Sequence, residues 1–116
     1  MQGHNDLLVW QKAMDLVTEI YRLTRAFPKE ELYGLTSQIR RAAVSVPSNI
    51  AEGHALKQTP AYLRHLAIAS GSLAELQTQL QIASRLGYLS RANTAVFSKA
   101  EEVSRMLAGL RRSLAK

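Results

Sequence analysis

Hydrophobic residues recur at alternating spacings of three and four positions along four stretches of the chain, which is the period of an amphipathic α-helix. The first stretch covers about residues 7–26 and ends before Pro28, because a proline disfavours helix at the residue that precedes it. Asn5 or Asp6 is the expected N-cap of this helix. Its apolar stripe consists of Trp10, Ala13, Val17, Ile20, Thr24 and Phe27, widened by Val9, Leu16 and Leu23.

The second stretch predicts a helix over about residues 31–52 that contains one helix-breaking residue and ends at another. Pro47 lacks a backbone N–H, so we expect either a kink or a helix that ends and restarts near Ser45 and Ser48. Gly53 then offers a left-handed stop. The buried face of this helix is expected to consist of Leu35, Ile39, Ala42, Val46 and Ile50.

Two further helices are predicted over about residues 60–86 and 91–115. Thr59 as N-cap followed by Pro60 is a start signal, and Leu86-Gly87 is a stop signal. Ser90 is the expected N-cap of the last helix. No stretch has the alternation of a β-strand. Residues 1–116 therefore predict one all-α domain, an antiparallel up-down-up-down four-helix bundle, left-handed, with helix crossings of roughly 20°.

Composition narrows the class of protein. Hydrophobic residues make up 47% of the chain and aromatic residues only 6%, so an aliphatic core is expected. Cysteine is absent, which excludes disulfides and thiolate metal sites. The N-terminus, MQGHNDLLVW, does not have the pattern of a signal peptide, and no stretch approaches the roughly 20 apolar residues of a membrane span. We therefore expect a soluble, cytoplasmic protein with no membrane partner.

The net charge of +6 and the isoelectric point near 10.1 favour acidic partners, of which nucleic acid is the commonest. The lysines and arginines are spread over the whole chain rather than gathered in a tail. A solvated basic face without any ligand is therefore the alternative interpretation.

Signals of catalysis are missing from the sequence. A metal site in a helical bundle needs acids and histidines that converge from facing helices, usually with a Glu-x-x-His pair, and the chain has no such pair. His4, His54 and His65 are scattered over separate segments. No phosphate-binding glycine motif is present either. We expect no catalytic residue, no metal and no cofactor.

Polar residues interrupt the second and third helices. Glu52 and Glu75 lie within or beside apolar stretches, and a buried carboxylate needs a cationic or hydrogen-bonding partner. One interpretation is therefore a structural polar cluster of Arg41, Asn49, Glu52 and Glu75 that fixes the helix register. The other is contact with a ligand or a subunit, with Arg40 as the outward member of the Arg40-Arg41 pair, able to grip a phosphate. Four tyrosines either stack on bases or pack their rings: Tyr21, Tyr33, Tyr62 and Tyr88.

Several motifs together resemble a known family. They are Trp10-Gln11-Lys12-Ala13, Phe27-Pro28, Tyr33-Gly34-Leu35, Gln38-Ile39-Arg40-Arg41-Ala42-Ala43, residues 45–53 (SVPSNIAEG) and residues 69–75 (ASGSLAE). Through them nearly the whole chain resembles the small bacterial proteins encoded by intervening sequences within 23S rRNA genes, some of which carry a ribosomal-protein name. Relatives often have extra basic or aromatic residues around 53–63, where this chain reads GHALKQTPAYL, so the resemblance predicts less RNA contact by that loop.

The resemblance implies an antiparallel bundle that assembles into closed rings of five subunits. It also implies that one branch of the family serves as an accessory factor to a retroelement reverse transcriptase, with a basic ring surface that engages RNA or DNA. Carried onto this chain, it assigns Arg40 and Arg41 to the ring interface or the polyanion surface. Three further phosphate contacts are expected at Lys12, Arg22 and Arg25. Two hypotheses follow: an oligomeric module that binds RNA or DNA, or a ring-forming protein scaffold without a nucleic-acid ligand.

Overall fold

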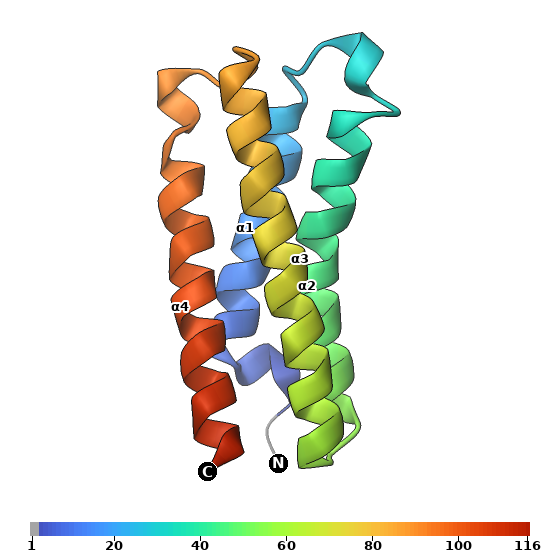
Figure 1. Cartoon of the computed structure of the whole chain (residues 1–116), viewed down its shortest axis with the longest axis vertical. Coiled ribbons are helices and arrows are strands. Elements are labelled where there is room, and N and C mark those ends of the chain that lie inside the picture. Colours follow the sequence, from blue (N-terminus) through green and yellow to red (C-terminus); the bar gives the residue numbers. More distant parts are fainter. Residues whose placement is uncertain (1–2) are drawn as a thin grey trace.

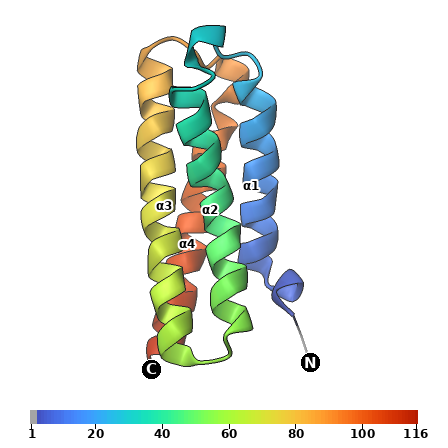
Figure 2. The same cartoon turned by 90° about the vertical axis from the view of Figure 1, so that its right-hand side faces the viewer.

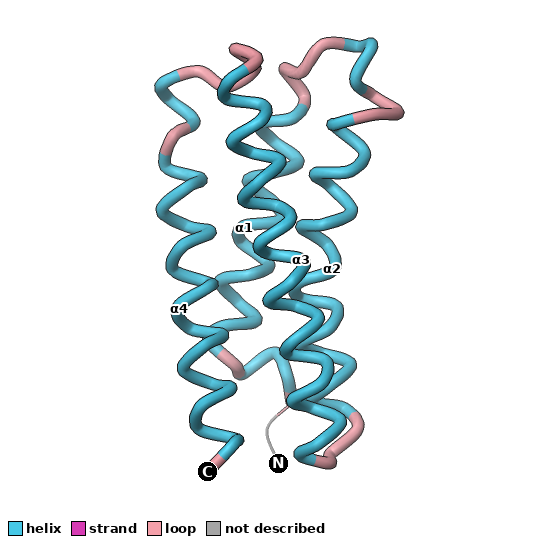
Figure 3. Tube along the Cα trace, viewed as in Figure 1, coloured by secondary structure: helices cyan, strands magenta, loops and turns pink. Residues whose placement is uncertain are grey.

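The computed structural model describes residues 3–116, which form four long α-helices (Figure 1). These are α1 (Leu8–Thr24), α2 (Leu35–Ala55), α3 (Thr59–Arg85) and α4 (Ala95–Ala115). Consecutive helices run antiparallel and pack together, and α1 also packs against α4, so the four close into an up-down-up-down bundle (Figures 1 and 2). The bundle measures 43 × 24 × 21 Å. The described residues contain no strand, which confirms the all-α prediction (Figure 3).

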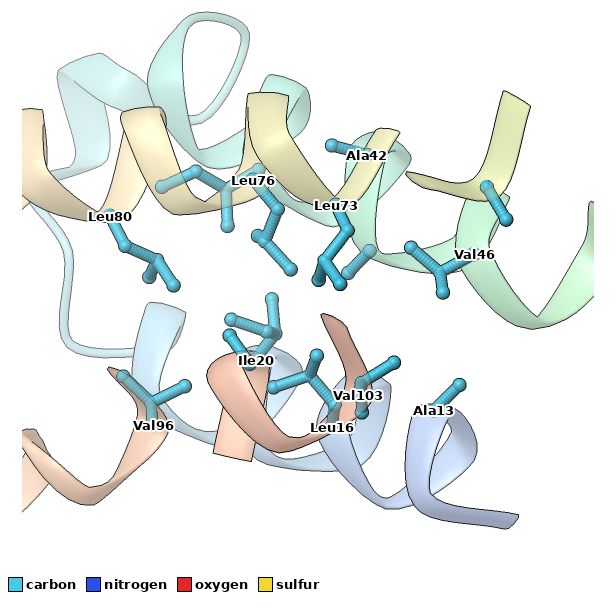
Figure 4. Packing of buried hydrophobic residues seen from close by; sticks show 14 of the residues in the cluster. Ala13, Leu16, Ile20, Ala42, Val46, Leu73, Leu76, Leu80, Val96 and Val103 are labelled. Atoms are coloured by element: carbon cyan, nitrogen blue, oxygen red, sulfur yellow. The ribbon is translucent and has the colours of Figure 1, made fainter. Parts of the chain in front are cut away.

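The core is aliphatic, as the composition predicts, and all four helices contribute to it (Figure 4). Each fully buried leucine or isoleucine contributes about 1.5–3 kcal/mol through removal of its apolar surface from water. The stripes predicted for the first two helices supply five of the fully buried side chains, Leu16, Ile20, Ile39, Val46 and Ile50. The largest fully buried side chains are Leu16, Ile20, Ile39, Ile50, Leu66, Leu73, Leu76, Leu80, Leu107, Val46, Val96 and Val103.

Two of the four predicted helix starts, those of α2 and α4, are wrong by four residues, and the predicted N-cap of α1 is wrong, because short 3₁₀ helices occupy the polar segments before these helices. Asn5 and Asp6 belong to η1 (His4–Asp6), and the N-cap of α1 is Leu7. Helix α2 begins at Leu35, after η2 (Lys29–Glu31). Ser90 precedes η3 (Arg91–Asn93), and α4 begins only at Ala95. Short 3₁₀ turns are common connectors of this kind.

The start and the end of α3 lie close to the predicted positions. Gln58 rather than Thr59 is the N-cap, and Pro60 lies in the first turn as expected. The helix ends at Arg85, and Gly87 has φ +80°, the left-handed conformation that glycine adopts at helix ends.

Gly53 does not end α2, contrary to the prediction. It is buried within the helix, where α2 approaches α3 closely. A Cβ atom built at Gly53 would lie 2.8 Å from His65 Cβ and 3.0 Å from Tyr62 Cδ1. The glycine is therefore required for close helix packing rather than for a turn, and the left-handed residue after the helix is Lys57, with φ 55°.

Helix α2 runs through Pro47 without a break, so the prediction that it ends and restarts there is wrong. Pro47 is buried in the helix. A bend at this proline, like the left-handed crossing of the bundle, stays a prediction.

Candidate nucleic-acid interface

Two of the arginines and lysines predicted to contact phosphate lie in a groove of mixed charge between α1 and α4. Lys12 Nζ is 4.0 Å from Glu102 Oε1, and Arg22 Nη1 is 2.9 Å from Glu19 Oε2. Three cations and three acids line this groove, so the charges balance locally and a polyanion gains little there. The lining residues are Lys12, Asp15, Thr18, Glu19, Arg22, Lys99 and Glu102.

The neighbours Arg40 and Arg41 have different surroundings. Arg40 is half-buried, and its Nε donates to Thr24 Oγ1 at 2.9 Å while its guanidinium carbon lies 4.7 Å from the centre of the Tyr21 ring. Arg41 is exposed on the wall of a polar groove between α2 and α3. The prediction that Arg40 is the outward member of the pair is therefore wrong. Arg40 packs against α1, whereas Arg41 is the exposed residue.

Arg25 lies just beyond the end of α1 and is exposed. Within residues 3–116 it makes no ion pair. Of the five predicted phosphate contacts, Arg25, Arg40 and Arg41 make no ion pair within residues 3–116, and of these three only Arg25 and Arg41 are exposed.

The polar residues of the SVPSNIAEG motif join α2 to α3. Ser45 Oγ lies 2.8 Å from Ser72 Oγ, and Asn49 Nδ2 donates to the Ser45 carbonyl at 2.9 Å. The Asn49 side-chain oxygen lies 3.0 Å from His65 Nδ1. Because the Asn49 amide nitrogen is used on Ser45, its oxygen accepts, which places a proton on His65 Nδ1. The motif therefore fixes the register of the α2/α3 pair.

The predicted cluster of Arg41, Asn49, Glu52 and Glu75 does not form as one unit. Asn49 and Glu52 meet at His65, where Glu52 Oε2 lies 3.5 Å from Nδ1. Arg41 and Glu75 line the groove between α2 and α3, and Glu75 accepts from Gln79 at 3.0 Å. Both glutamates are exposed, so neither is the buried carboxylate that the sequence predicts. Sequence reasoning missed His65, whose place opposite Asn49 depends on how the two helices pair.

Three of the four tyrosines have their rings or hydroxyls engaged in the fold. The ring of Tyr21 lies under Arg40, and Tyr88 packs against Phe27 with ring centres 5.5 Å apart. The Tyr62 ring meets the His54 ring edge-on at 5.8 Å, and burial raises the pKa of its hydroxyl. Tyr33 alone is almost fully exposed, at 94%, in the link before α2.

A groove that the sequence did not predict lies between the first half of α3 and the last half of α4. Arg111 of α4 reaches across to α3, where its Nη1 donates to Ser70 Oγ at 3.3 Å. The floor is apolar and two arginines stand at its rim, around a volume of about 370 Å³. The lining residues are Leu63, Ala108, Arg111, Arg112 and Ala115.

Charge is concentrated around this groove. Residues 57–74 and 103–116 hold six lysines and arginines and no aspartate or glutamate, whereas the remainder of the chain holds nine of each. The whole net charge of +6 therefore belongs to two segments, which the antiparallel pairing of α3 and α4 brings side by side (Figures 1 and 2). We call this area the basic surface. Its cations are Lys57, Arg64, Arg105, Arg111, Arg112 and Lys116.

Taken alone, the lysines and arginines are spread over the whole chain. The signal that could have revealed the basic surface was the absence of acids from the two segments. Recognising them as one surface also required the pairing of α3 with α4, because more than 25 residues separate them in the chain.

Two apolar areas are also exposed on the bundle, and the second of them begins within residues 57–74. One is a groove between α1 and α2 lined by Trp10, Met14, Val17, Val44, Pro47 and Ser48. The other is an exposed ridge along α3, formed by Ala67, Ile68, Gly71, Ala74, Thr78 and Ile82. Glu75 is the one charged residue between Ala67 and Ile82.

Residues 3–116 contain no group of three acids or histidines placed to hold a metal ion. None of the helices in this part of the chain is long and apolar enough to cross a bilayer.

Comparison with known proteins places this architecture in a family. A crystal structure of a Bacteroides thetaiotaomicron protein of unknown function, from the S23 ribosomal protein family, matches with a TM-score of 0.82. The two sequences are 20% identical, and the match covers 90% of this chain and 96% of the other, so it shows the fold. No curated protein matches the chain. The family model of the 23S rRNA-intervening sequence proteins matches residues 5–109. The chain therefore belongs to the 23S rRNA-intervening sequence protein family.

Proposed function

We propose that this protein is a cytoplasmic, non-catalytic, self-associating bundle that binds RNA or DNA through phosphate contacts. The observation that carries the proposal is the concentration of the net charge of +6 in the basic surface. A region with six cations and no acid of its own gives a polyanion a continuous positive potential, and each phosphate it neutralises releases condensed counterions. The same charges scattered among acids would not have this effect.

Individual contacts around the basic surface agree with an accessible set of cations. Arg64, Arg112 and Lys116 are exposed, and none of them makes an ion pair within residues 3–116. Arg105 lies 3.6 Å from Glu101, but both side chains are about two-thirds exposed, so this pair is weak and a phosphate can displace the acid.

The test compares two double charge reversals that change the net charge equally. Arg64→Glu with Arg112→Glu alters the basic surface, and Arg22→Glu with Arg25→Glu alters the surface predicted from the sequence. Fluorescence anisotropy with labelled RNA and DNA across a salt series should show linear weakening in log salt for the wild type. We expect the first variant to lose at least about tenfold in affinity and the second to lose less than about threefold.

Other outcomes have defined meanings. A larger loss in Arg22→Glu with Arg25→Glu would move the interface to the α1 surface that the sequence predicts. Absence of wild-type binding at low salt would overturn the nucleic-acid proposal. Circular dichroism of each variant verifies that its fold is intact.

A second candidate function, a ring-forming scaffold, is favoured by the two apolar areas. The groove is formed by α1 and α2 and the ridge consists of exposed residues of α3, so the two areas lie on different parts of one subunit. A contact of groove with ridge is heterologous, and such contacts close into rings when the rotation allows it. Five subunits and a partner protein such as a reverse transcriptase are the assembly we propose for this candidate.

Light scattering tests the scaffold. Val44 is 40% exposed in the groove and Ile68 is 47% exposed on the ridge, so Val44→Glu and Ile68→Glu should each reduce the assembly to monomers. Arg41→Ala should do the same if Arg41 pairs with an acid across the subunit boundary. Unchanged mass in all three variants would count against this assembly.

A further inference from the structure

We infer that the basic surface recognises double-stranded nucleic acid, through its phosphate backbone and without base readout. This inference rests on the proposed function and specifies its ligand class. It is carried by three features of the basic surface: the kinds of side chain it lacks, the confinement of its one aromatic ring, and the spacing of its cations.

No aromatic ring is available on this surface for bases to stack on. Tyr62 is the one aromatic residue in residues 57–74 and 103–116. One side of its ring lies against the backbone of Gly53, the edge of His54 meets it, and its hydroxyl is buried. Proteins that bind single strands generally combine a basic groove with aromatic stacking platforms. The basic surface has the charge but not the platform.

Amide and carboxylate side chains, which read the edges of adenine and cytosine, are nearly absent as well. Readout of adenine uses Asn or Gln, and readout of cytosine uses Asp or Glu. In these two segments the only such residue is Gln58, at the N-cap of α3. Readers of adenine and cytosine are therefore missing, and we infer that the arginines, which can also read guanine, engage phosphates, whose positions do not depend on sequence.

The cations form a fixed array rather than a flexible tail. Arg105 and Arg112 lie seven residues apart on α4, a separation of about 10 Å along the helix axis, and Lys116 follows the last residue of the helix. Arg111 is held across the groove by Ser70, and Arg112 lies back over Gly109, with Nη2 3.8 Å from a Cβ built there. A rigid array suits a ligand whose phosphates are already in place.

A duplex is such a ligand. It carries about one charge per 1.7 Å of axis and releases more counterions per contact than a single strand does. A single strand must also lose conformational freedom to follow a fixed array, and no stacking on this surface offsets that cost. With charge as the only attraction, the duplex should bind more tightly.

The experiment measures binding of one 24-nucleotide sequence as a single strand, as a DNA duplex and as an RNA duplex, by anisotropy over a salt series. A second duplex of the same composition and shuffled sequence serves as the control for base readout. We expect the original and the shuffled duplex to bind with equal affinity. Each duplex should bind at least about fivefold more tightly than the single strand at low salt. Four contacts, from Arg64, Arg111, Arg112 and Lys116, predict a log–log salt slope of about −3.6 for the DNA duplex and about −2.8 for the strand.

The possible failures are distinguishable. Equal or tighter binding of the single strand would overturn the duplex inference while the proposed function stood. A difference of tenfold or more between the shuffled duplexes would overturn the absence of base readout. No binding of any nucleic acid at low salt would overturn the proposed function itself. Arg112→Glu with Lys116→Glu should remove the duplex advantage, and unchanged affinity in this folded variant would place the contact elsewhere.

Discussion

Arg40 and Arg41 are consecutive in the chain, yet Arg40 is bound to Thr24 and Tyr21 of α1 while Arg41 faces the groove between α2 and α3. Consecutive residues of an α-helix point about 100° apart, so one arginine can pack while the other is exposed. The Arg40-Arg41 pair therefore combines one arginine that packs within the fold with one whose side chain is exposed to solvent.

Arg40→Ala should destabilise the bundle by about 1–2 kcal/mol, through loss of the Thr24 hydrogen bond and the cation–π contact with Tyr21. Arg41→Ala should change stability by less than about 0.5 kcal/mol, because within residues 3–116 its side chain has no partner. Urea unfolding of both variants measures the difference. Equal effects of the two substitutions would contradict the structural role of Arg40.

Gly53→Ala should destabilise the protein by about 1–3 kcal/mol, because the added methyl group overlaps His65 and Tyr62. The matched control is Gly71→Ala in α3, where a Cβ meets nothing within 4 Å. There alanine should stabilise by about 0.5–1 kcal/mol through its higher helix propensity. Thermal unfolding of the two variants should therefore shift in opposite directions. A stabilised Gly53→Ala protein would mean that α2 and α3 can separate without cost.

The apolar period alone predicted the four helices and most of the core, because each long helix must bury one continuous stripe such as that of Leu16 and Ile20. The predicted helix starts and caps failed where Asn5 and Glu31 lie in 3₁₀ turns and where Ser90 precedes one, so that the long helices begin further along the chain. Gly53 failed for another reason. Its role is set by a side chain of the facing helix, and spacing within α2 carries no information about that neighbour.

The candidate site was harder to predict for the same reason. The basic surface exists because α4 returns beside the first half of α3, which places Arg112 near Leu63. In the sequence, Arg112 and Leu63 belong to separate predicted helices, and neither helix has an unusual net charge. Lys12 and Arg22 were chosen from the resemblance. The acid beside Lys12, Glu102, became apparent only in the packed α1/α4 pair, whereas Glu19 lies three residues before Arg22 on α1 itself.

Asn49→Ala should destabilise the bundle by about 1–2 kcal/mol, because the Ser45 carbonyl and His65 Nδ1 each lose a partner at a half-buried position. Ser48→Ala is the control, since Ser48 is exposed on the same turn and should have little effect. Chemical denaturation gives the free-energy difference, and proton NMR of the His65 ring reports whether Nδ1 keeps its proton. A neutral Asn49→Ala variant would show that the motif does not hold α2 to α3.

Tyr88→Phe should lower the melting temperature and alter its dependence on alkaline pH. The Tyr88 hydroxyl donates to Glu31 Oε2 at 2.9 Å, and Glu31 Oε1 accepts the backbone N–H of Leu35 at 3.1 Å, so one carboxylate ties the α3/α4 link to the start of α2. The bond to Glu31 raises the pKa of Tyr88 above its value of 10.0 in an unfolded chain. Its stabilising effect is therefore complete below that value and is lost as the pH rises through the folded-state pKa.

The gap in melting temperature between wild type and Tyr88→Phe should be constant from pH 7 to 9 and should shrink above about pH 10, whereas Tyr33→Phe, at a fully solvated ring, should leave no gap. Absence of a gap at every pH would show that Tyr88 stabilises through its ring alone, and a gap that stayed constant to about pH 11.5 would contradict the loss of the Glu31 bond on ionisation.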